Sequence, residues 1–260
     1  MRNHAFISPG DAVIVTGAAG GIGLATVKAL VAQGNFVYAS DRNIAELKKS
    51  LLEIDPKGEF TESAVLDVAE EKACQSYCDA VAKKARPIRG LVNNAAIGAF
   101  NMSVETTSLE EWEHIIRINL TSLFLMSKYT VPHIRKSGGG AIVNVSSIHA
   151  IATSTGVSPY AAAKGGVMAL TKTMALDYAK DCIRVVALLP GATDTPMLRM
   201  HAEREGKSLA ELGFIMSDNA IGRIAQPEEL ADVVTFGLSR KATFVTGSAL
   251  VADGGILAKF

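Results

Sequence analysis

The chain has 260 residues, a length that fits one large α/β domain or two smaller ones. Hydrophobic residues make up 48% of it and charged residues 20%, which provides for a core and excludes a disordered chain. The 26 Lys and Arg residues balance the 26 Asp and Glu residues, so the formal net charge is zero. This balance disfavours nucleic acid and anionic membranes as main partners, because both attract an excess of cations.

The three cysteines, Cys74, Cys78 and Cys182, are too few for a disulfide framework. Cys74 and Cys78 lie four residues apart on an expected helix, and no nearby Cys or His completes a metal site, so we expect packing and no metal. Residues 1–13 lack the apolar run of a signal peptide, and the uncharged stretch 137–163 is too polar for a membrane span. We therefore expect a soluble, cytoplasmic protein.

Short apolar runs of strand length alternate with longer helical patterns. We expect strands at residues 12–16, 36–40, 63–66, 88–92, 141–145, 183–189 and 248–251. We expect helices at residues 21–33, 44–54, 70–85, 109–135, 159–180 and 228–238. Strands that are apolar on both faces and alternate with helices indicate a parallel sheet covered on each side. The prediction is an α/β fold, a doubly wound parallel sheet of about seven strands in one domain spanning residues 1–260.

The polar segment 195–224 interrupts this rhythm and directly follows a strand end. Long irregular insertions at that edge of a sheet are usually functional, so we predict a substrate lid rather than an idle surface loop. Its cations Arg199, His201, Arg204 and Lys207 give a local positive charge. They either attract an anionic group or solvate the segment, and we favour solvation.

A glycine cluster, Gly17, Gly21 and Gly23, lies between the first strand and the first helix. Glycine permits positive φ and lets phosphate oxygens approach the backbone, and the helix that begins there offers free N–H groups. A tight turn is the alternative role for these glycines. Their position after the first strand favours a site for a dinucleotide pyrophosphate.

Tyr160 and Lys164 lie one helical turn apart, so the phenol and the ammonium share a helix face. By itself such a pair is commonly a surface feature. Here Ser147 follows the strand 141–145 at the edge where the glycine loop lies. For base catalysis near neutral pH, the tyrosine pKa must fall from ~10 to about 7–8, which requires ~3–4 kcal/mol from its surroundings.

The spacing Gly-x-x-x-Gly-x-Gly, followed by Tyr-x-x-x-Lys, resembles the short-chain dehydrogenase/reductase family over almost the whole chain. Further matching motifs are Asn93-Asn94-Ala95-Ala96, in which Ala96 replaces glycine, and Ala252-Asp253-Gly254-Gly255. The resemblance implies a Rossmann-type fold, hydride transfer with NAD(P), and cofactor contacts from Gly17, Gly21, Ile22, Gly23, Asp41, Arg42, Asp67, Val68, Asn94, Ala95, Tyr160, Lys164, Pro190, Gly191, Thr193 and Thr195.

The same resemblance implies a catalytic set of Asn119, Ser147, Tyr160 and Lys164. Tyr160 would take the substrate proton, Ser147 would hold the reacting oxygen, and Lys164 would lower the tyrosine pKa and hold the nicotinamide ribose. Asn119 would anchor a water, in keeping with the poor fit of asparagine to a helix interior. We place the neighbouring Ser146 as a structural residue.

The choice of cofactor depends on Asp41, which ends the second strand eighteen residues beyond Gly23. A carboxylate there accepts both ribose hydroxyls of NAD and repels a 2′-phosphate, although capping the next helix is an alternative role. The adjacent Arg42 would welcome that phosphate. We predict NAD, with NADP less favoured, because repulsion at short range is hard to offset.

The substrate pocket is expected to contain Ser147, His149, Tyr160 and residues 97–100, with a structural role for His149 equally open. We predict a small polar secondary alcohol: a sugar, a hydroxy acid or a cyclic diol. Alternatives are an NADPH-dependent ketone reductase such as a 3-oxoacyl reductase, and a dinucleotide sensor without chemistry. The resemblance also implies a homotetramer, to which the apolar C-terminal residues 256–260 could contribute.

Overall fold

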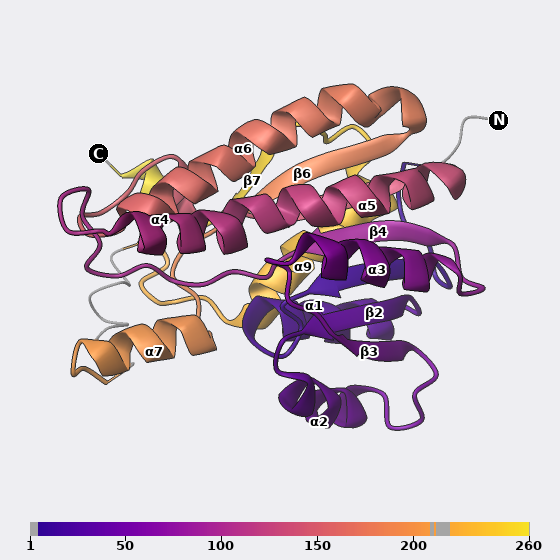
Figure 1. The fold of residues 1–260 in the computed structure, drawn as a ribbon, viewed down its shortest axis with the longest axis horizontal. Coiled ribbons are helices and arrows are strands. Elements are labelled where there is room, and N and C mark those ends of the chain that lie inside the picture. The colour runs from indigo at the N-terminus through magenta and orange to yellow at the C-terminus, as the bar shows by residue number, and fades with distance from the viewer. Residues whose placement is uncertain (1–4, 209–210, 212–218, 260) are drawn as a thin grey trace.

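Seven parallel strands form one twisted sheet in the computed structural model, which describes residues 5–208, 211 and 219–259 (Figure 1). The strands are β1 (Ala12–Thr16), β2 (Phe36–Asp41), β3 (Thr61–Val65), β4 (Ile88–Asn93), β5 (Gly140–Val145), β6 (Ile183–Pro190) and β7 (Ala249–Ala252). Their order across the sheet is β3-β2-β1-β4-β5-β6-β7, and every pairing is parallel. The predicted doubly wound α/β fold is confirmed.

Helices cover both faces of the sheet (Figure 1). They are α1 (Gly21–Ala32), α2 (Ile44–Ile54), α3 (Glu71–Ala82), α4 (Leu109–Ile116), α5 (Ser122–Lys136), α6 (Ser158–Tyr178), α7 (Pro196–Arg204) and α9 (Pro227–Leu238). Alternate residues of β1 show the two layers: Val13 and Val15 pack with α1 and α9, while Ile14 packs with α3, α5 and α6. The core therefore lies on both sides of the sheet.

The strand order reverses beside β1, which pairs with β2 on one side and β4 on the other. Loops that leave the carboxyl ends of β1 and β4 diverge at this point because their helices lie on opposite faces of the sheet. Such a switch point opens a crevice in doubly wound sheets. The chain thus brings its glycine loop, the loop after β4 and the end of β5 to one rim.

Two predicted segments differ in the structure. The expected helix 109–135 is divided into α4 and α5 by a π-helical turn, Arg117–Thr121. The segment expected to be irregular contains α7, because Thr195 caps its first turn by accepting a bond from the Leu198 N–H (3.4 Å) and Pro196 occupies the first helical position. Of the same segment, residues 209–210 and 212–218 lie outside the described residues.

Cys74 and Cys78 are fully buried between α3 and α5, where they pack as small residues. Burial raises the pKa of the Cys74 thiol to about 12 and that of Cys78 to about 11. Both thiols are therefore protonated and unreactive at neutral pH. Among the described residues, no helix is long and apolar enough to span a bilayer, and no group of three His, Cys, Asp or Glu side chains could hold a metal ion.

Candidate active site

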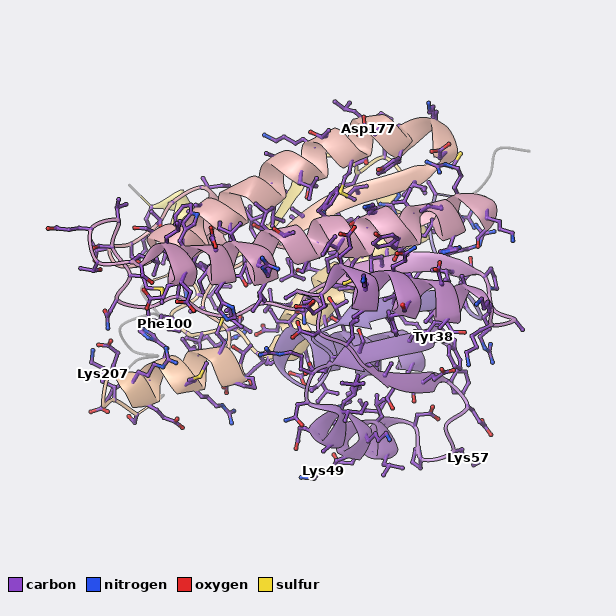
Figure 2. The ribbon with its side chains drawn as sticks, in the orientation of Figure 1. Tyr38, Lys49, Lys57, Phe100, Asp177 and Lys207 are labelled. Carbon is purple, nitrogen blue, oxygen red and sulfur yellow. The ribbon has the colours of Figure 1, made fainter. Side chains whose placement is uncertain are left out.

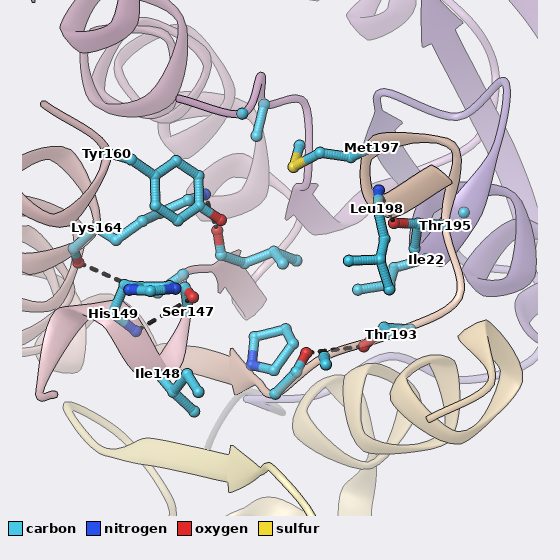
Figure 3. A pocket seen from close by; sticks show the side chains of 18 of the residues that line it. Ile22, Ser147, Ile148, His149, Tyr160, Lys164, Thr193, Thr195, Met197 and Leu198 are labelled. Atoms are coloured by element: carbon cyan, nitrogen blue, oxygen red, sulfur yellow. Dashed lines mark hydrogen bonds between the residues drawn. The ribbon is translucent and has the colours of Figure 1, made fainter. Parts of the chain in front are cut away.

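A cleft of about 1120 Å³ runs along the carboxyl ends of the strands (Figure 3). It is larger than the ~300–1,000 Å³ of a typical small-molecule pocket, so it has room for an extended ligand and a second small one. The predicted site residues that line it are Gly17, Gly21, Ile22, Asp41, Asn94, Ala95, Ser147, His149, Tyr160, Lys164, Pro190, Gly191, Thr193 and Thr195. Gly23, Arg42, Asp67, Val68 and Asn119 are not among the lining residues.

The N-terminus of α1 opens into the middle of this cleft. Its N-cap residue, Gly20, has no side chain that could cap the helix, and the first turn contains no acidic residue. The N–H groups and the positive end of the helix dipole are therefore directed at the cleft without a competing anion. Gly21 adopts φ +55°, and a Cβ there would lie 3.1 Å from Thr195 Cγ2. These features fit the pyrophosphate of a dinucleotide.

Two other glycines serve packing between loops. Gly17 has φ +65°, and a Cβ on it would come within 2.8 Å of Ala95 Cα, while a Cβ on Gly23 would lie 2.1 Å from the Gly17 carbonyl oxygen. The Asn94 amide donates to the carbonyls of Thr16 (3.1 Å) and Gly17 (2.9 Å) and so ties the loop after β4 to the glycine loop. Gly23 therefore has a steric role, and its expected cofactor contact stays a prediction.

The Asp41 carboxylate lines the far end of the cleft and accepts from the N–H groups of Ala19 (3.1 Å) and Asn43 (2.9 Å). Arg42 does not line the cleft: its exposed guanidinium pairs with Asp67 at 3.9 Å. Val68 is buried in the core beside α3. Arg42, Asp67 and Val68 are thus not among the residues that line the cleft, and their expected cofactor contacts stay predictions. Asp41 is the member of this group that lines it.

The end of β5 and the start of α6 bring three reactive side chains together. The Lys164 ammonium is fully buried and donates to the Val145 carbonyl (2.9 Å), while the Ser146 hydroxyl donates to the Lys164 carbonyl (2.9 Å). The Lys164 ammonium lies 5.5 Å from the centre of the Tyr160 ring. Ser147 and Tyr160 share one side of the cavity, and Met197, Leu198 and Thr195 lie along the other (Figure 3). Ser146 has the structural role expected of it.

Burial determines the protonation states of Tyr160 and Lys164. It lowers the pKa of Lys164 to about 8 and raises that of Tyr160, against which the hydrogen bond with Ser147 acts. Desolvation is the larger of the two effects on Tyr160, and the expected lowering of its pKa by Lys164 together with a bound nicotinamide stays a prediction. At neutral pH the lysine is mostly charged and the phenol is protonated.

Asn119 lies behind the cleft and is not among its lining residues. It lies in the π-helical turn, is fully buried, and uses both side-chain atoms on one backbone partner: its Nδ2 donates to the Ile97 carbonyl and its Oδ1 accepts from the Ile97 N–H, both at 2.8 Å. The poor fit of asparagine to a helix is thus compensated by a contact 22 residues away in the chain. Its amide anchors the loop after β4.

The substrate end combines a polar side with an apolar side. On the polar side, His149 Nδ1 bonds with Thr153 Oγ1 (2.9 Å), and its ring meets Tyr160 edge-on with centroids 5.7 Å apart. Burial lowers the pKa of His149, which keeps the ring neutral at pH 7. The apolar residues that line the cleft include Phe100, Met197, Leu198, Ile256 and Leu257, and Ile148 lies beside His149 (Figure 3).

Sequence reasoning missed part of this apolar side. Met197 and Leu198 were hidden in a segment expected to be irregular, and Ile256 and Leu257 were expected at a subunit interface but line the cleft. The four cations of the segment do not line it: Arg199 pairs with Asp194 (2.9 Å) and Lys207 with Glu205 (3.7 Å). Lys164 is the one Lys or Arg among the described residues that line the cleft.

The family of the chain is now identifiable. A family model described as enoyl-(acyl carrier protein) reductase matches residues 17–257. The chain belongs to the short-chain dehydrogenase/reductase family. The predicted family is confirmed, and with it an NAD(P)-dependent dehydrogenase or reductase of small molecules.

Three members illustrate what this short-chain dehydrogenase is similar to. The cyclohexanol dehydrogenase of Acinetobacter sp. (strain SE19) is 38% identical over 246 residues, 95% of this chain and 94% of the relative. The 3-oxoacyl-(acyl-carrier-protein) reductase FabG of Thermotoga maritima is 34% identical over 95% of this chain and 98% of its own length. The solved structure of Thermoplasma acidophilum aldohexose dehydrogenase superposes with a TM-score of 0.88 at 33% identity, covering 97% of this chain and 96% of that one.

The buried Lys164 of this short-chain dehydrogenase makes its stability depend on pH. Its pKa is about 8 in the folded chain, against an ordinary value of 10.5, so between these values the unfolded chain holds one more proton. Raising the pH therefore stabilises the fold. Relative to Lys164→Met, the free energy of unfolding of the unchanged protein is expected to rise by about 2 kcal/mol from pH 7 to pH 9.5.

Urea unfolding at the two pH values measures this difference. Lys172, exposed on the same helix, is the matched control, because its side chain is solvated in both states. Lys172→Met is expected to follow the unchanged protein. A Lys164→Met curve that also runs parallel to the unchanged protein would contradict the lowered lysine pKa.

Proposed function

We propose that the protein interconverts a small, uncharged secondary alcohol on a ring and its ketone, with NAD as the hydride carrier. The observation that supports this class is the absence of any Lys or Arg other than Lys164 among the described residues that line the cleft. Lys164 itself is directed at the Val145 carbonyl. A substrate carboxylate or phosphate would be desolvated there without a counter-ion, which is costly. Within the predicted classes, cyclic alcohols and neutral sugars are therefore favoured over hydroxy acids.

The apolar side of the substrate end favours rings with few polar groups. Phe100, Met197 and Leu257 offer contact area and no hydrogen bonds, while His149 offers a single polar tip. One relative is a cyclohexanol dehydrogenase, in keeping with such a substrate. We propose an alicyclic alcohol whose second polar group, where it has one, bonds with His149.

The proposed chemistry uses three side chains. The Tyr160 phenolate accepts the carbinol proton, and the Ser147 hydroxyl donates to the substrate oxygen as it becomes a carbonyl. When bound, NAD⁺ supplies the hydride acceptor and a positive charge beside the phenol. The charged Lys164, held by Val145, favours the phenolate further. Asn119 positions the loop after β4, and a water-anchoring role for it stays a prediction.

Two carboxylates support NAD over NADP. Asp41 and Glu46 both line the far end of the cleft, where a 2′-phosphate would lie. Arg42, the cation that would favour this phosphate, is paired with Asp67 instead. An NADPH-dependent 3-oxoacyl reductase, which the Thermotoga maritima relative exemplifies, remains the second candidate. A sensor without chemistry is disfavoured because Ser147, Tyr160 and Lys164 occur together in the cleft.

A substrate panel tests the proposed function directly. Cyclohexanol, trans-1,2-cyclohexanediol, glucose and 3-hydroxybutyrate are each assayed with NAD and NADP by the absorbance of the reduced nicotinamide. We expect the ring alcohols with NAD to give the highest kcat/KM. Tyr160→Phe is expected to lower kcat by about 10²–10⁴-fold while the Kd for NAD stays nearly unchanged, because general-base catalysis is lost and the cofactor contacts remain. A preference for 3-hydroxybutyrate would refute the uncharged substrate class.

Removing the carboxylate of Asp41 is expected to weaken the preference for NAD. Asp41→Asn should raise the ratio of kcat/KM for NADP to that for NAD by about tenfold, or ~1.4 kcal/mol, since one repulsive charge is lost. Glu53→Gln makes the same charge change at an exposed site on α2 outside the cleft and should leave the ratio as it is. Equal ratios for the two variants would count against Asp41 as the selecting residue.

We also propose a homotetramer. Apolar side chains lie exposed on adjoining helices: Leu109 and Trp112 on α4, Phe124 on α5 and Leu176 on α6, the last 82% exposed. Exposed apolar patches of this kind mark protein–protein contacts. Light scattering is expected to give about four times the 27.3 kDa of one chain, and the mass of a single chain would contradict the proposal.

A further inference from the structure

A stack of two aromatic rings joins α7 to the loop after β4. The rings of Phe100 and His201 are almost parallel, at 13°, with centroids 4.0 Å apart. A second contact follows one residue on, where the Asn101 amide donates to Glu205 Oε1 (3.3 Å). Phe100 lies on the loop directly beside α7 (Figure 2). The loop and the helix are thus held together at the substrate end of the cleft.

Gly98 makes room for this arrangement. A Cβ at Gly98 would lie 2.4 Å from Phe100 Cε2 and 2.6 Å from Cζ, and 3.4 Å from Met197 Cγ. The Phe100 ring therefore folds back onto its own loop, and a side chain at position 98 would displace the ring from this position. Gly98, Phe100 and Met197 all line the cleft, so the folded ring is part of its wall.

The loop is anchored on both sides of the ring. Ile97 is held by the amide of Asn119 (2.8 Å), and the Met102 N–H donates to the Gly156 carbonyl (2.7 Å). The Met102 carbonyl in turn accepts from the Ser158 N–H (3.0 Å) at the start of α6, two residues before Tyr160. Only residues 98–101 lie between these anchors, so the position of Phe100 is fixed relative to the phenol.

His201 is suited to holding this ring. Its Nδ1 is buried and has no hydrogen-bond partner among the described residues, so its contact with Phe100 is made by the ring face. Burial lowers its pKa, which keeps the imidazole uncharged at neutral pH. A neutral ring stacks on phenylalanine without desolvation of a charge.

We propose that Phe100 is a specificity-determining residue that limits the bulk of the substrate ring, and that His201 is the positioning residue that holds it over the cleft. The inference rests on the proposed function, since it assumes a ring alcohol at the substrate end. In this proposal Phe100 contacts the ring of an alcohol bound at Ser147 and Tyr160, because all three residues line the same cleft. A compact ring fits beneath it, whereas a bulky substituent meets it.

The test compares cyclohexanol with 4-tert-butylcyclohexanol. Phe100→Ala and His201→Ala are each expected to raise the kcat/KM ratio of the bulky to the compact alcohol by about tenfold or more, because an apolar wall discriminates by roughly that factor. His201→Phe preserves the stack and should keep the ratio of the unchanged protein. Met200→Ala, exposed on the same helix, is the matched control and should also keep it.

Two results would overturn the inference: an unchanged ratio in Phe100→Ala, or a His201→Phe ratio equal to that of His201→Ala. Failure of the unchanged protein to oxidise cyclohexanol with NAD would overturn the proposed function instead. The stack of Phe100 on His201 is then tested by NMR, because the Phe100 ring current shifts the His201 Cε1–H signal. Phe100→Ala is expected to move this signal, and a signal that stays in place overturns the role of His201 in holding Phe100.

Discussion

The hydrogen bond from the buried Lys164 ammonium to the Val145 carbonyl is the contact on which the candidate site depends. Together with the bond from Ser146 to the Lys164 carbonyl, it joins the end of β5 to the first turns of α6. Ser147 and Tyr160, which lie next to this junction, therefore keep their relative positions. Loops are usually mobile, but here the reactive groups lie at the ends of regular elements that are bonded to each other.

The rest of the cleft is arranged by the reversal of strand order beside β1. The switch point brings the free N-terminus of α1 beside the ends of β4 and β5. Asn94 bonds the two loops that border the opening, and Asn119 holds the loop after β4 from the opposite face of the sheet. The side chains of Asn94, Asn119 and Lys164 each donate a hydrogen bond to a backbone carbonyl. These bonds fix the positions of the loops and helix that present the reactive residues.

Much of the fold was predictable because its signals are local. Runs such as residues 12–16 are apolar on both faces and of strand length, which favours a parallel strand covered on each side, and the glycine spacing follows from backbone space and φ. The contacts that the sequence could not indicate join partners that are distant in the chain. Asn119 forms hydrogen bonds with Ile97, and Arg42 pairs with Asp67. Leu257 lines a cleft in which most of the other residues come much earlier in the chain. Periodicity contains no information about such contacts.

The segment expected to be irregular shows the same limit at short range. Residues 196–204 have a polar composition, and the helix there is indicated only by Thr195 and Pro196, a cap and a first-turn proline. The function of α7 in the cleft depends on Met197 and His201, which face a loop 100 residues earlier in the chain. A pattern of side chains can indicate that a helix forms, but not which surface it covers.

Burial disfavours the charged forms of both Tyr160 and Lys164, although base catalysis requires both charges. The lysine pKa of about 8 leaves it mostly protonated at neutral pH, so the ammonium is retained with little margin. The phenol is not ionised by this ammonium alone, since desolvation dominates its pKa. In the proposed function, an oxidised nicotinamide would add a second positive charge to that of Lys164, which lies 5.5 Å from the centre of the Tyr160 ring. The base that we propose would then depend on two cations of different origin, one supplied by this chain and one by the cofactor.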